Sequence, residues 1–452
     1  MLELSQIAAL VIFVVMFIAI VSDKWHRYIP ALVGATLTII ILFLLVMRSP
    51  EAIINVLNLG QITQFNFWVP GEQHVETHGV NWQTVIFIGG MMVMVESMAK
   101  AGFFRWLCLL LAKMVNYQVM PILIVFMLAS GFLAMFIDSI TVLLFMTGIV
   151  IELARLLKFD PVPVIIAMIF AANTGGAATM SGDPPNIIIG TAFGYTFMDF
   201  VVNTGIIAWA GMLVTLGYFF LVSRKALLSS QEKRDTLMTY PEPGETITNP
   251  LLFRINTAIF ILVVTLIVTH ATTGISIALI GVIAALLTML AAFRNVRHVI
   301  KGVDWRTLLF FIGLFIAVGG LEETGLLERL AVFIGDKSGG NILIVIPIIL
   351  WVSAVASAIV DNIPFAAVMV PVIRNLSMTV GLKLPTLAWT LALGADIGGN
   401  ATPIGASANV VGTAIAAKEG YPISWGRFCK YAIPATILVV GLSWLLLVVR
   451  YG

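Results

Sequence analysis

Charged residues and cysteines are both scarce in this 452-residue chain. Only 11% of its residues are charged and 60% are hydrophobic, with a mean hydropathy of +1.05. A soluble protein carries about 25% charged residues, so a soluble globular domain is excluded. The two cysteines, Cys108 and Cys429, are too few and too far apart for a disulfide framework or a metal-binding motif. The net charge of +2 gives no indication of nucleic-acid binding, and we expect none.

Long apolar runs recur along the whole chain, for example at Ile7–Val21, Ala31–Met47 and Ala432–Val449. Each is close to the roughly 20 residues that cross a bilayer as a helix. Because lipid offers no partner for backbone polar groups, helices are the expected spanning structure. The sequence therefore predicts an all-α polytopic protein, multi-pass in the cell inner (plasma) membrane, with membrane lipid around it. We expect no cleaved signal peptide, because the first run lacks a basic region and a small-residue cleavage site.

An internal repeat at a constant offset divides the chain. The stretch "NWQTVIFIGGMMVMVESMAKAGFFRWL" begins at Asn81, and "DWRTLLFFIGLFIAVGGLEETGLLERL" begins at Asp304. At the same offset, "AANTGGAATMSGDPPN" (171–186) aligns with "GADIGGNATPIGASAN" (394–409), with seven of 16 positions identical. We therefore predict two homologous halves, 1–226 and 250–452. A polar, proline-containing linker over 227–249 joins them.

Each half contains five candidate spans, and an odd number implies that the second half is inverted relative to the first. Two further segments, 121–155 and 343–376, carry an aspartate in mid-run and are interpreted as re-entrant hairpins. The segment 103–118, which mixes basic residues with leucines, is placed at the membrane interface. If it and its repeat partner both cross the membrane, the inversion argument fails. The predicted spans are 4–21, 31–48, 83–99, 162–192 (broken), 203–223, 251–270, 275–293, 306–322, 385–415 (broken) and 431–449.

The distribution of Lys and Arg supports this topology. With the N-terminus outside, 19 of the 25 basic residues fall in cytoplasmic segments, Arg27 among them. The six on the outside are Arg48, Arg329, Lys337, Arg374, Lys383 and Arg450. This asymmetry is the one that the positive-inside rule expects. Inverted repeats with broken helices are typical of secondary transporters, which bind substrate and ions where the half-helices meet.

Polar residues within the membrane concentrate at the two hairpin tips and the two helix breaks. Free N–H and C=O groups at such breaks can hold an oxyanion, a neutral hydroxyl solute or, with a carboxylate, Na⁺ or H⁺. A carboxylate at this depth costs on the order of 2.5–3.5 kcal/mol, so each aspartate is a functional candidate. The predicted substrate- or ion-binding residues are Asp138, Ser139, Asn173, Thr174, Gly175, Gly176, Thr179, Asp183, Asn186, Asp361, Asn362, Asp396, Gly398, Gly399, Asn400, Thr402, Ser407 and Asn409. Na⁺ would bind at Asp138, Asn173, Asp361 and Asp396.

Several of these residues have structural alternatives. The paired glycines (175, 176, 398, 399) can equally serve close helix packing, and Asp183 or Asp396 can cap a half-helix. His74 and His78 have the i, i+4 spacing of a metal site, but they lie in a polar loop outside the predicted spans, so we interpret them as solvated. Methionines 91, 92 and 94 and Cys108 could bind a metalloid, but packing is the commoner role.

Three motifs give the chain a family resemblance: "GGAATMSGDPPNIIIG", "DNIPFAAVMVPV" and "GGNATPIGASANVVG". Together they resemble the ion transporter superfamily, in its branch of arsenite-efflux permeases, NhaD-type antiporters and melanosomal P proteins. The resemblance implies two re-entrant hairpins and two unwound helices around one central site, often with elevator-like movement. It also allows a homodimer and a cytoplasmic ATPase partner. The sodium-carboxylate branch typically has Ser-Asn-Thr at both tips, whereas Asp138 and Asp361 put a carboxylate in each tip here.

The leading functional hypothesis is a proton-coupled efflux permease for arsenite or antimonite, small neutral trihydroxides that hydroxyl, amide and backbone groups could hold. A Na⁺/H⁺ antiporter using the same carboxylates is the alternative. A small organic-anion transporter is less favoured, because neither break contains Arg or Lys. An enzyme is not expected: an aspartyl intramembrane protease would carry Gly-x-Gly-Asp, which is absent. No cofactor is expected beyond the coupling ion, H⁺ or Na⁺.

Overall fold

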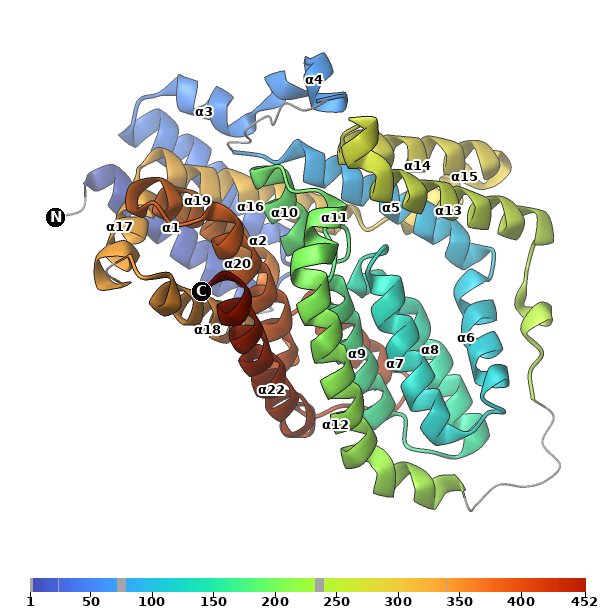
Figure 1. Cartoon of the computed structure of the whole chain (residues 1–452). Coiled ribbons are helices and arrows are strands. Elements are labelled where there is room, and N and C mark those ends of the chain that lie inside the picture. The colour runs from blue at the N-terminus through green and yellow to red at the C-terminus, as the bar shows by residue number, and fades with distance from the viewer. Residues whose placement is uncertain (1–2, 23, 71–78, 232–239, 339) are drawn as a thin grey trace.

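The computed structural model describes residues 3–22, 24–70, 79–231, 240–338 and 340–452, and in these ranges the regular structure is helical throughout (Figure 1). Within the described ranges, ten helical segments are long and apolar enough to cross a membrane, so the chain is a multi-pass membrane protein. The first half contains α1 (Leu4–Val21), α2 (Tyr28–Leu37), η1 (Thr38–Val46), α3 (Pro50–Leu57), η2 (Leu59–Thr63), α4 (Phe65–Trp68), α5 (Trp82–Lys100), α6 (Phe103–Met114), α7 (Val119–Ala134), α8 (Ser139–Leu157), α9 (Val162–Gly176), α10 (Pro184–Phe193), α11 (Phe197–Phe200), η3 (Val201–Gly205) and α12 (Ile206–Gln231).

After a short turn, η4 (Pro243–Thr246), the second half repeats the order of the long helices. It contains α13 (Pro250–Thr273), α14 (Ile277–Ala291), η5 (Phe293–Asn295), α15 (Val296–Gly302), α16 (Trp305–Glu323), α17 (Leu326–Ser338), α18 (Ile342–Ile359), α19 (Asn362–Val380), α20 (Leu384–Gly398), η6 (Gly399–Ala401), α21 (Ser407–Lys418) and α22 (Trp425–Tyr451).

Helix boundaries follow the repeat in the sequence. The long helix α5 runs from 82 to 100 and α16 from 305 to 323, so both helices begin and end at equivalent positions of the repeat. Their starts use the same local chemistry: Asn81 accepts a hydrogen bond from the Thr84 amide at 3.1 Å, and Asp304 accepts one from the Thr307 amide at 3.3 Å. Such N-caps satisfy one of the free N–H groups of a helix start. The same kind of capping residue at the same repeat position therefore starts the helix in both halves.

Both hairpins and both helix breaks are present. Helices α7 and α8 form the first hairpin and α18 and α19 the second, with short turns at 135–138 and 360–361. The first break separates α9 from α10 and the second separates α20 from α21. Prolines 184 and 185 occupy the first positions of α10, where a missing N–H costs nothing. That the hairpins enter and leave on one membrane side remains a prediction, since α8, α18 and α19 are each long enough to span.

Long helices of each half pack against the other half. Helix α2 packs on α16, and α14 packs on α5, as the neighbouring ribbons in Figure 1 show. The half-helices cross over in the same way, with α10 against α19 and α21 against α8 and α9. This exchange brings both hairpin tips and both helix breaks into one central region. The division at 227–249 remains an interpretation of the sequence.

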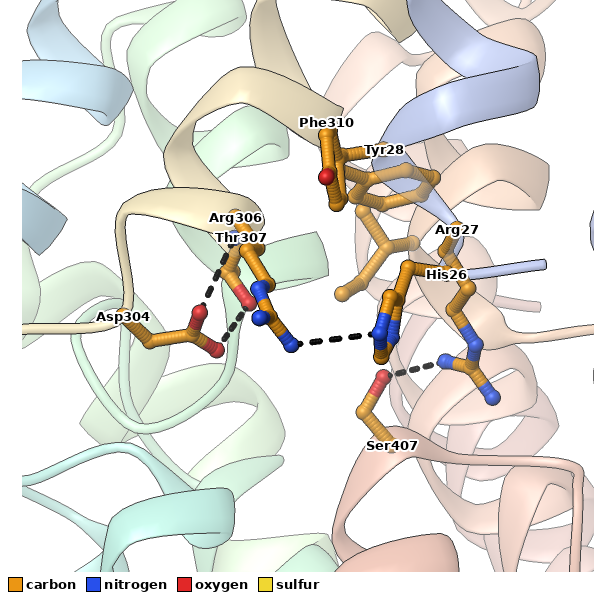
Figure 2. Close-up of a pocket in the computed structure, with 9 residues that line it drawn as sticks. His26, Arg27, Tyr28, Asp304, Arg306, Thr307, Phe310 and Ser407 are labelled. Carbon is orange, nitrogen blue, oxygen red and sulfur yellow. Dashed lines mark hydrogen bonds between the residues drawn. The ribbon is translucent and has the colours of Figure 1, made fainter.

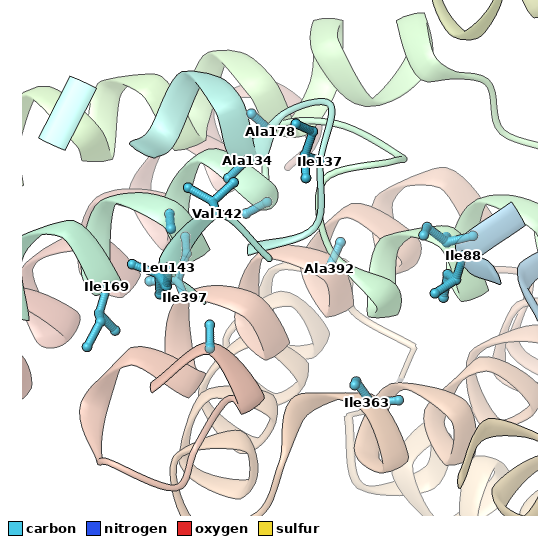
Figure 3. Close-up of a cluster of buried hydrophobic side chains, with 14 of the residues drawn as sticks. Ile88, Ala134, Ile137, Val142, Leu143, Ile169, Ala178, Ile363, Ala392 and Ile397 are labelled. Atoms are coloured by element: carbon cyan, nitrogen blue, oxygen red, sulfur yellow. The ribbon is translucent and has the colours of Figure 1, made fainter. Parts of the chain in front are cut away.

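The buried core surrounds that central region. Figure 3 shows Ala134 and Ile137 near the first tip, Ile363 near the second, and Ile169 and Ile397 on α9 and α20. Every residue of α9 is buried, so this helix contacts protein on every side. Exposed large apolar side chains lie on α1, α13 and α22, among others. Such apolar exposure on long helices is what a lipid-facing surface requires.

The structure differs from the predicted elements in a few places. The predicted span at 203–223 begins earlier, at Phe197. Helix α14 ends at Ala291 and is shorter than its predicted range of 275–293. The short helices α3, α4 and α15 were not predicted. Helix α6 buries Phe104 and Cys108 while Arg105 and Lys113 stay exposed, the amphipathic pattern expected of an interfacial helix. His74, His78 and the linker's residues 232–239 lie outside the described residues.

Candidate functional site

The two hairpin aspartates cap the helices that follow them. Asp138 accepts hydrogen bonds from the Thr141 amide at 3.0 Å and from the Thr141 hydroxyl at 2.6 Å. Asp361 accepts one from the Ile363 amide at 3.1 Å. Each carboxylate therefore lies at the positive end of a helix dipole, which stabilises its charge. Beyond this shared role the two tips differ.

Arg27 distinguishes the second tip from the first. Its guanidinium forms an ion pair with Asp361 and donates to the Ser407 hydroxyl at 2.7 Å. The Ser407 hydroxyl donates to the same Asp361 carboxylate. Arg27 precedes α2, far from either helix break in sequence, where it is one basic residue of a short loop. No motif or spacing indicates its partner, because the contact depends on the packing of α2 against the second half.

Asp183, in the first helix break, lies at the centre of the site. It is the N-cap residue of α10, but its side chain makes no capping hydrogen bond. Instead, its carboxylate accepts from Ser139 at 2.8 Å and from Asn362 at 2.7 Å. These donors come from the two hairpin tips, so Asp183 joins both tips to the first break. The alternative that Asp183 serves as a helix cap is therefore not supported by its contacts.

Asp396, near the end of α20, is the second central carboxyl group. Asn362 Nδ2 lies 3.4 Å from Asp396 Oδ1 while also donating to Asp183. The two carboxyl groups are themselves within hydrogen-bonding reach of each other. Asp183 is 3% exposed and Asp396 is fully buried. Among the described residues, no Lys or Arg forms an ion pair with either carboxyl group.

A cluster of amides lies beside this carboxyl pair. Asn173 Nδ2 donates to Asn400 Oδ1 at 2.9 Å and to Asn409 Oδ1 at 2.8 Å. Asn173 occupies the position of the first repeat that is equivalent to Asp396 in the second. The break of one half is thus hydrogen-bonded to the break of the other half. All three asparagines are almost completely buried.

Two equivalent asparagines hold the unwound segments in shape. Asn186 Nδ2 donates to the carbonyls of Gly176 and Thr179, at 3.1 and 3.0 Å. Asn409 makes the same contacts with Gly399 and Thr402, both at 2.7 Å. The Thr179 and Thr402 hydroxyls donate in turn to the Met135 and Ala358 carbonyls of the hairpins. These side chains supply donors to carbonyl groups where the helix is interrupted, of which the Gly176 and Thr402 carbonyls also accept from the Thr179 and Gly405 amides.

The paired glycines allow close packing of backbone. A Cβ on Gly175 would lie 2.1 Å from the Gly131 carbonyl oxygen, and one on Gly398 would lie 2.2 Å from Ala354 Cα. Gly176 and Gly399 approach the carbonyls of Gly182 and Gly405 in the same way. None of the four has a positive φ. Their geometry matches the packing alternative, although packing does not prevent their carbonyls from contributing to the site.

A cavity of about 290 Å³ opens beside the second tip (Figure 2). Ser407 and Arg27 meet on one side of it, and Arg306 lies across from them with its guanidinium 3.3 Å from His26 Nε2. Asp304 is held by Thr307, which donates to it at 2.6 Å. The lining residues are His26, Arg27, Tyr28, Asp304, Arg306, Thr307, Phe310, Ile363 and Ser407. Of these, only Ser407 is among the predicted site residues.

Most of the predicted polar residues come together in one cluster. Asp361 and Ser407 form a separate set with Arg27, and Thr174 and Asp138 bond within their own helices. Ser139, Asn173, Asp183, Asn362 and Asp396 belong to the central cluster, with Asn186, Asn400 and Asn409 alongside. Thr174 donates within its own helix, to Phe170 at 2.7 Å, and the Asp138 carboxylate accepts from Thr141 and the Ile140 amide, at the start of the helix that it caps. Four buried atoms of the cluster have no hydrogen-bond partner among the described residues, namely Asn173 Oδ1, Asn186 Oδ1, Asp396 Oδ2 and Asn400 Nδ2.

Comparisons with known proteins identify relatives over the whole chain. The family described as "Citrate transporter" matches residues 17–394. An uncharacterized transporter of Mycobacterium tuberculosis is 31% identical over 451 residues, covering 99% of both chains. The human P protein is 28% identical over 465 residues, covering 84% of this chain and 55% of its own length. Among solved structures, the YdaH transporter of Alcanivorax borkumensis shares the fold, with a TM-score of 0.58, 15% identity and coverage of 90% and 89%. MtrF of Neisseria gonorrhoeae has a TM-score of 0.53, 13% identity and coverage of 96% and 94%.

Proposed function

The chain belongs to the citrate transporter family, and we propose that it is a secondary active transporter coupled through Asp183 and Asp396. The carrying observation is the contact between these two buried carboxyl groups, bridged by Asn362 and paired with no Lys or Arg among the described residues. Two carboxylates in contact cannot both stay ionised without strong repulsion. The pair therefore shares a proton or holds a cation. A charge that must be neutralised to lie in the membrane is suited to coupling.

The proposed substrate is arsenite or antimonite, exported in exchange for protons across the cell inner membrane. At neutral pH each is a small, largely neutral trihydroxide that both donates and accepts hydrogen bonds. The four unpartnered atoms of the cluster are three acceptors, on Asn173, Asn186 and Asp396, and one donor, on Asn400. This set complements three hydroxyl groups without requiring a fixed positive charge. Substrate binding would compensate polar atoms that are otherwise costly to bury.

Na⁺/H⁺ antiport is the second candidate, and the same three acceptor oxygens favour it. Hard cations prefer oxygen ligands, and carboxylate and amide oxygens with free backbone carbonyls supply them. Na⁺ and H⁺ would then compete for the carboxyl pair, each displacing the other. This candidate does not use the unpartnered Asn400 donor.

The cavity beside the second tip makes a small organic anion a third candidate. Arg27 and Arg306 line it. Neither residue lies in a helix break, so the sequence argument, which considered only the breaks, did not include them. Arg27 is already paired with Asp361, so Arg306 and His26 would have to supply most of the attraction. The family's description names citrate, a tricarboxylate, and a substrate of that charge would need more cation than this cavity offers.

Reconstitution in liposomes separates these candidates. The internal pH is followed with a trapped dye after adding arsenite, antimonite, Na⁺, Li⁺ or citrate. If arsenite is exported in exchange for protons, arsenite or antimonite should change the internal pH in the absence of Na⁺. A response to Na⁺ and Li⁺ alone would replace arsenite export with cation antiport, and a response to citrate alone would favour the anion. In every case, Asp183→Asn and Asp396→Asn should abolish the response.

A further inference from the structure

The second hairpin tip carries a resident positive charge. The Arg27 guanidinium contacts the Asp361 carboxylate and the Ser407 hydroxyl, and that hydroxyl also donates to Asp361. The three groups therefore form a closed set of hydrogen bonds. The Asp361 side chain is only 2% exposed, whereas the Arg27 side chain, which lines the cavity, is 22% exposed. The positive charge that compensates the buried Asp361 carboxylate is thus a side chain of the protein itself.

The equivalent position of the first repeat lacks this arrangement. Asp138 corresponds to Asp361, and Pro184, which has no hydroxyl, corresponds to Ser407. Helix α14 packs on α5 as α2 packs on α16, and α14 is preceded by Ser276 where α2 is preceded by Arg27. Among the described residues, Asp138 makes no ion pair with Lys or Arg. One tip is therefore provided with a fixed cation and the other is not.

We propose that Arg27 is a tethered cation, which takes the place of a transported cation at the second hairpin tip. This rests on the proposed function, in which a cation couples transport. The ligands that the guanidinium uses are a tip carboxylate and a hydroxyl at the start of a half-helix, which are oxygen ligands of the kind that a monovalent cation would need. Because the guanidinium is attached to the chain, it cannot cross the membrane. The coupling cation is then restricted to the Asp183–Asp396 pair.

The surroundings of Asp361 support the idea that another cation could replace the Arg27 guanidinium. Removing one partner of a buried ion pair leaves an uncompensated charge, which is strongly destabilising unless another cation replaces it. The other charged or titratable groups near Asp361, among the described residues, are Asp183, which interacts with it electrostatically, and the cavity residues His26, Tyr28, Arg306 and Asp304. Arg306 bonds to His26, and within the described part of the chain neither forms a hydrogen bond or ion pair with Asp361. Arg27 lines both the 290 Å³ cavity, with Ser407, and a smaller pocket, with Asp361. In the absence of Arg27, an external cation would approach Asp361 through the space that the Arg27 side chain occupies.

The test compares the melting temperature of the full-length protein, purified in detergent, in NaCl and in choline chloride of equal ionic strength. Both salts are used at alkaline and at acidic pH. Arg27→Gln should acquire a saturable stabilisation by Na⁺, or by acid in choline chloride, in addition to any response that the unsubstituted protein shows through its Asp183–Asp396 pair; the two conditions distinguish Na⁺ from H⁺. Arg27→Lys should not acquire it, since a cation remains. Arg27→Gln/Asp361→Asn should also lack it, because no charge is left to neutralise. Arg306→Gln is the control for losing a positive charge in the same cavity.

Three results would overturn the tethered cation. The first is an Arg27→Gln response equal to that of the unsubstituted protein, and the second is a gained response that survives Asp361→Asn. The third is an Arg27→Gln variant that does not fold in either salt at either pH, although Arg27→Gln/Asp361→Asn does fold. Failure of the proposed function is seen separately, as transport in liposomes that survives both Asp183→Asn and Asp396→Asn. The response gained by Arg27→Gln should persist when Asp183→Asn is added, because it belongs to Asp361.

Discussion

Asn362, at the second hairpin tip, donates a hydrogen bond to the carboxylate of Asp183, in the first helix break, at 2.7 Å. The two residues are 179 positions apart and belong to different repeats. The same amide nitrogen approaches Asp396 in the second break. One side chain therefore links a tip to both breaks, so a change of charge on either carboxyl group alters a hydrogen bond of the hairpin. This is the kind of direct connection that coupling of ion binding to movement requires.

Neutralising either central carboxyl group should abolish coupled transport. Asp183→Asn and Asp396→Asn remove the charge that must be neutralised, while the amide keeps the size of the side chain. We expect the substrate-dependent pH change in liposomes to fall to the rate of protein-free vesicles, with the protein still folded. Asp336→Asn, on an exposed position of α17, is the matched control and should transport normally. Full activity of both central variants would contradict the proposed coupling site.

The side-chain amides of Asn186 and Asn409, one in each break, should stabilise the protein by the same mechanism. Asn186→Ala and Asn409→Ala each remove the side-chain donor of two backbone carbonyls, of which the Gly176 and Thr402 carbonyls keep a backbone donor. A buried polar group that loses its partner costs about 1–3 kcal/mol, so both variants should melt at a lower temperature in detergent. Asn295→Ala, at an exposed turn, should have the same melting temperature as the unsubstituted protein. A large effect at one asparagine and none at the other would show that the breaks are not equivalent.

Much of the fold could be predicted because the repeat and the capping residues are local in sequence. Helix α1 has the predicted bounds, 4–21, and the hairpin helices α8 and α19 begin and end at equivalent positions of the repeat. The predicted 203–223 span was too short at its start because Phe197–Phe200 and the π-helical turn at Val201–Gly205 extend it. A capping box at Thr196 and Asp199 marks this earlier start and is recognisable in the sequence.

Residues of the central cluster could be predicted, but their partners could not. Polar side chains in apolar runs are visible in any sequence, and that alone identified Asp183, Asp396 and Asn362. Arg27 gave no such signal, since a basic residue in a short loop is ordinary. Its contact with Asp361 exists because α2 packs on the opposite half. Likewise, the sequence could not tell that Asp138 and Asp361 cap helices while Asp183, in an N-cap position, does not.

Glycine positions should differ sharply in their tolerance of alanine. At Gly175 a Cβ would lie 2.1 Å from the Gly131 carbonyl oxygen, backbone that cannot move aside without separating α7 from α9. Gly175→Ala should therefore destabilise the protein by at least about 1–3 kcal/mol. Gly148→Ala, on α8, meets no atom within 4 Å and should be neutral or stabilising by roughly 0.5–1 kcal/mol. Melting temperatures of the two variants in detergent measure the difference, and equal values would contradict the close packing.

The two cysteines offer a direct test of the predicted topology. Cys108 is fully buried and Cys429, near the start of α22, is partly exposed, so a maleimide should modify Cys429 alone in the folded protein. With the N-terminus outside, Cys429 lies on the cytoplasmic side, between Arg427 and Lys430. A membrane-impermeant maleimide should then label it in inside-out vesicles and not in intact cells.

A second cysteine position makes that test independent of labelling efficiency. Leu59→Cys, placed in a background without the two native cysteines, lies at an exposed position between α3 and α4 that the topology puts outside. It should show the reverse pattern, labelled in intact cells and protected in inside-out vesicles. If both positions are labelled from the same side, the segments between them cross the membrane an even number of times. The two halves would then cross the membrane a different number of times, which contradicts five spans in each.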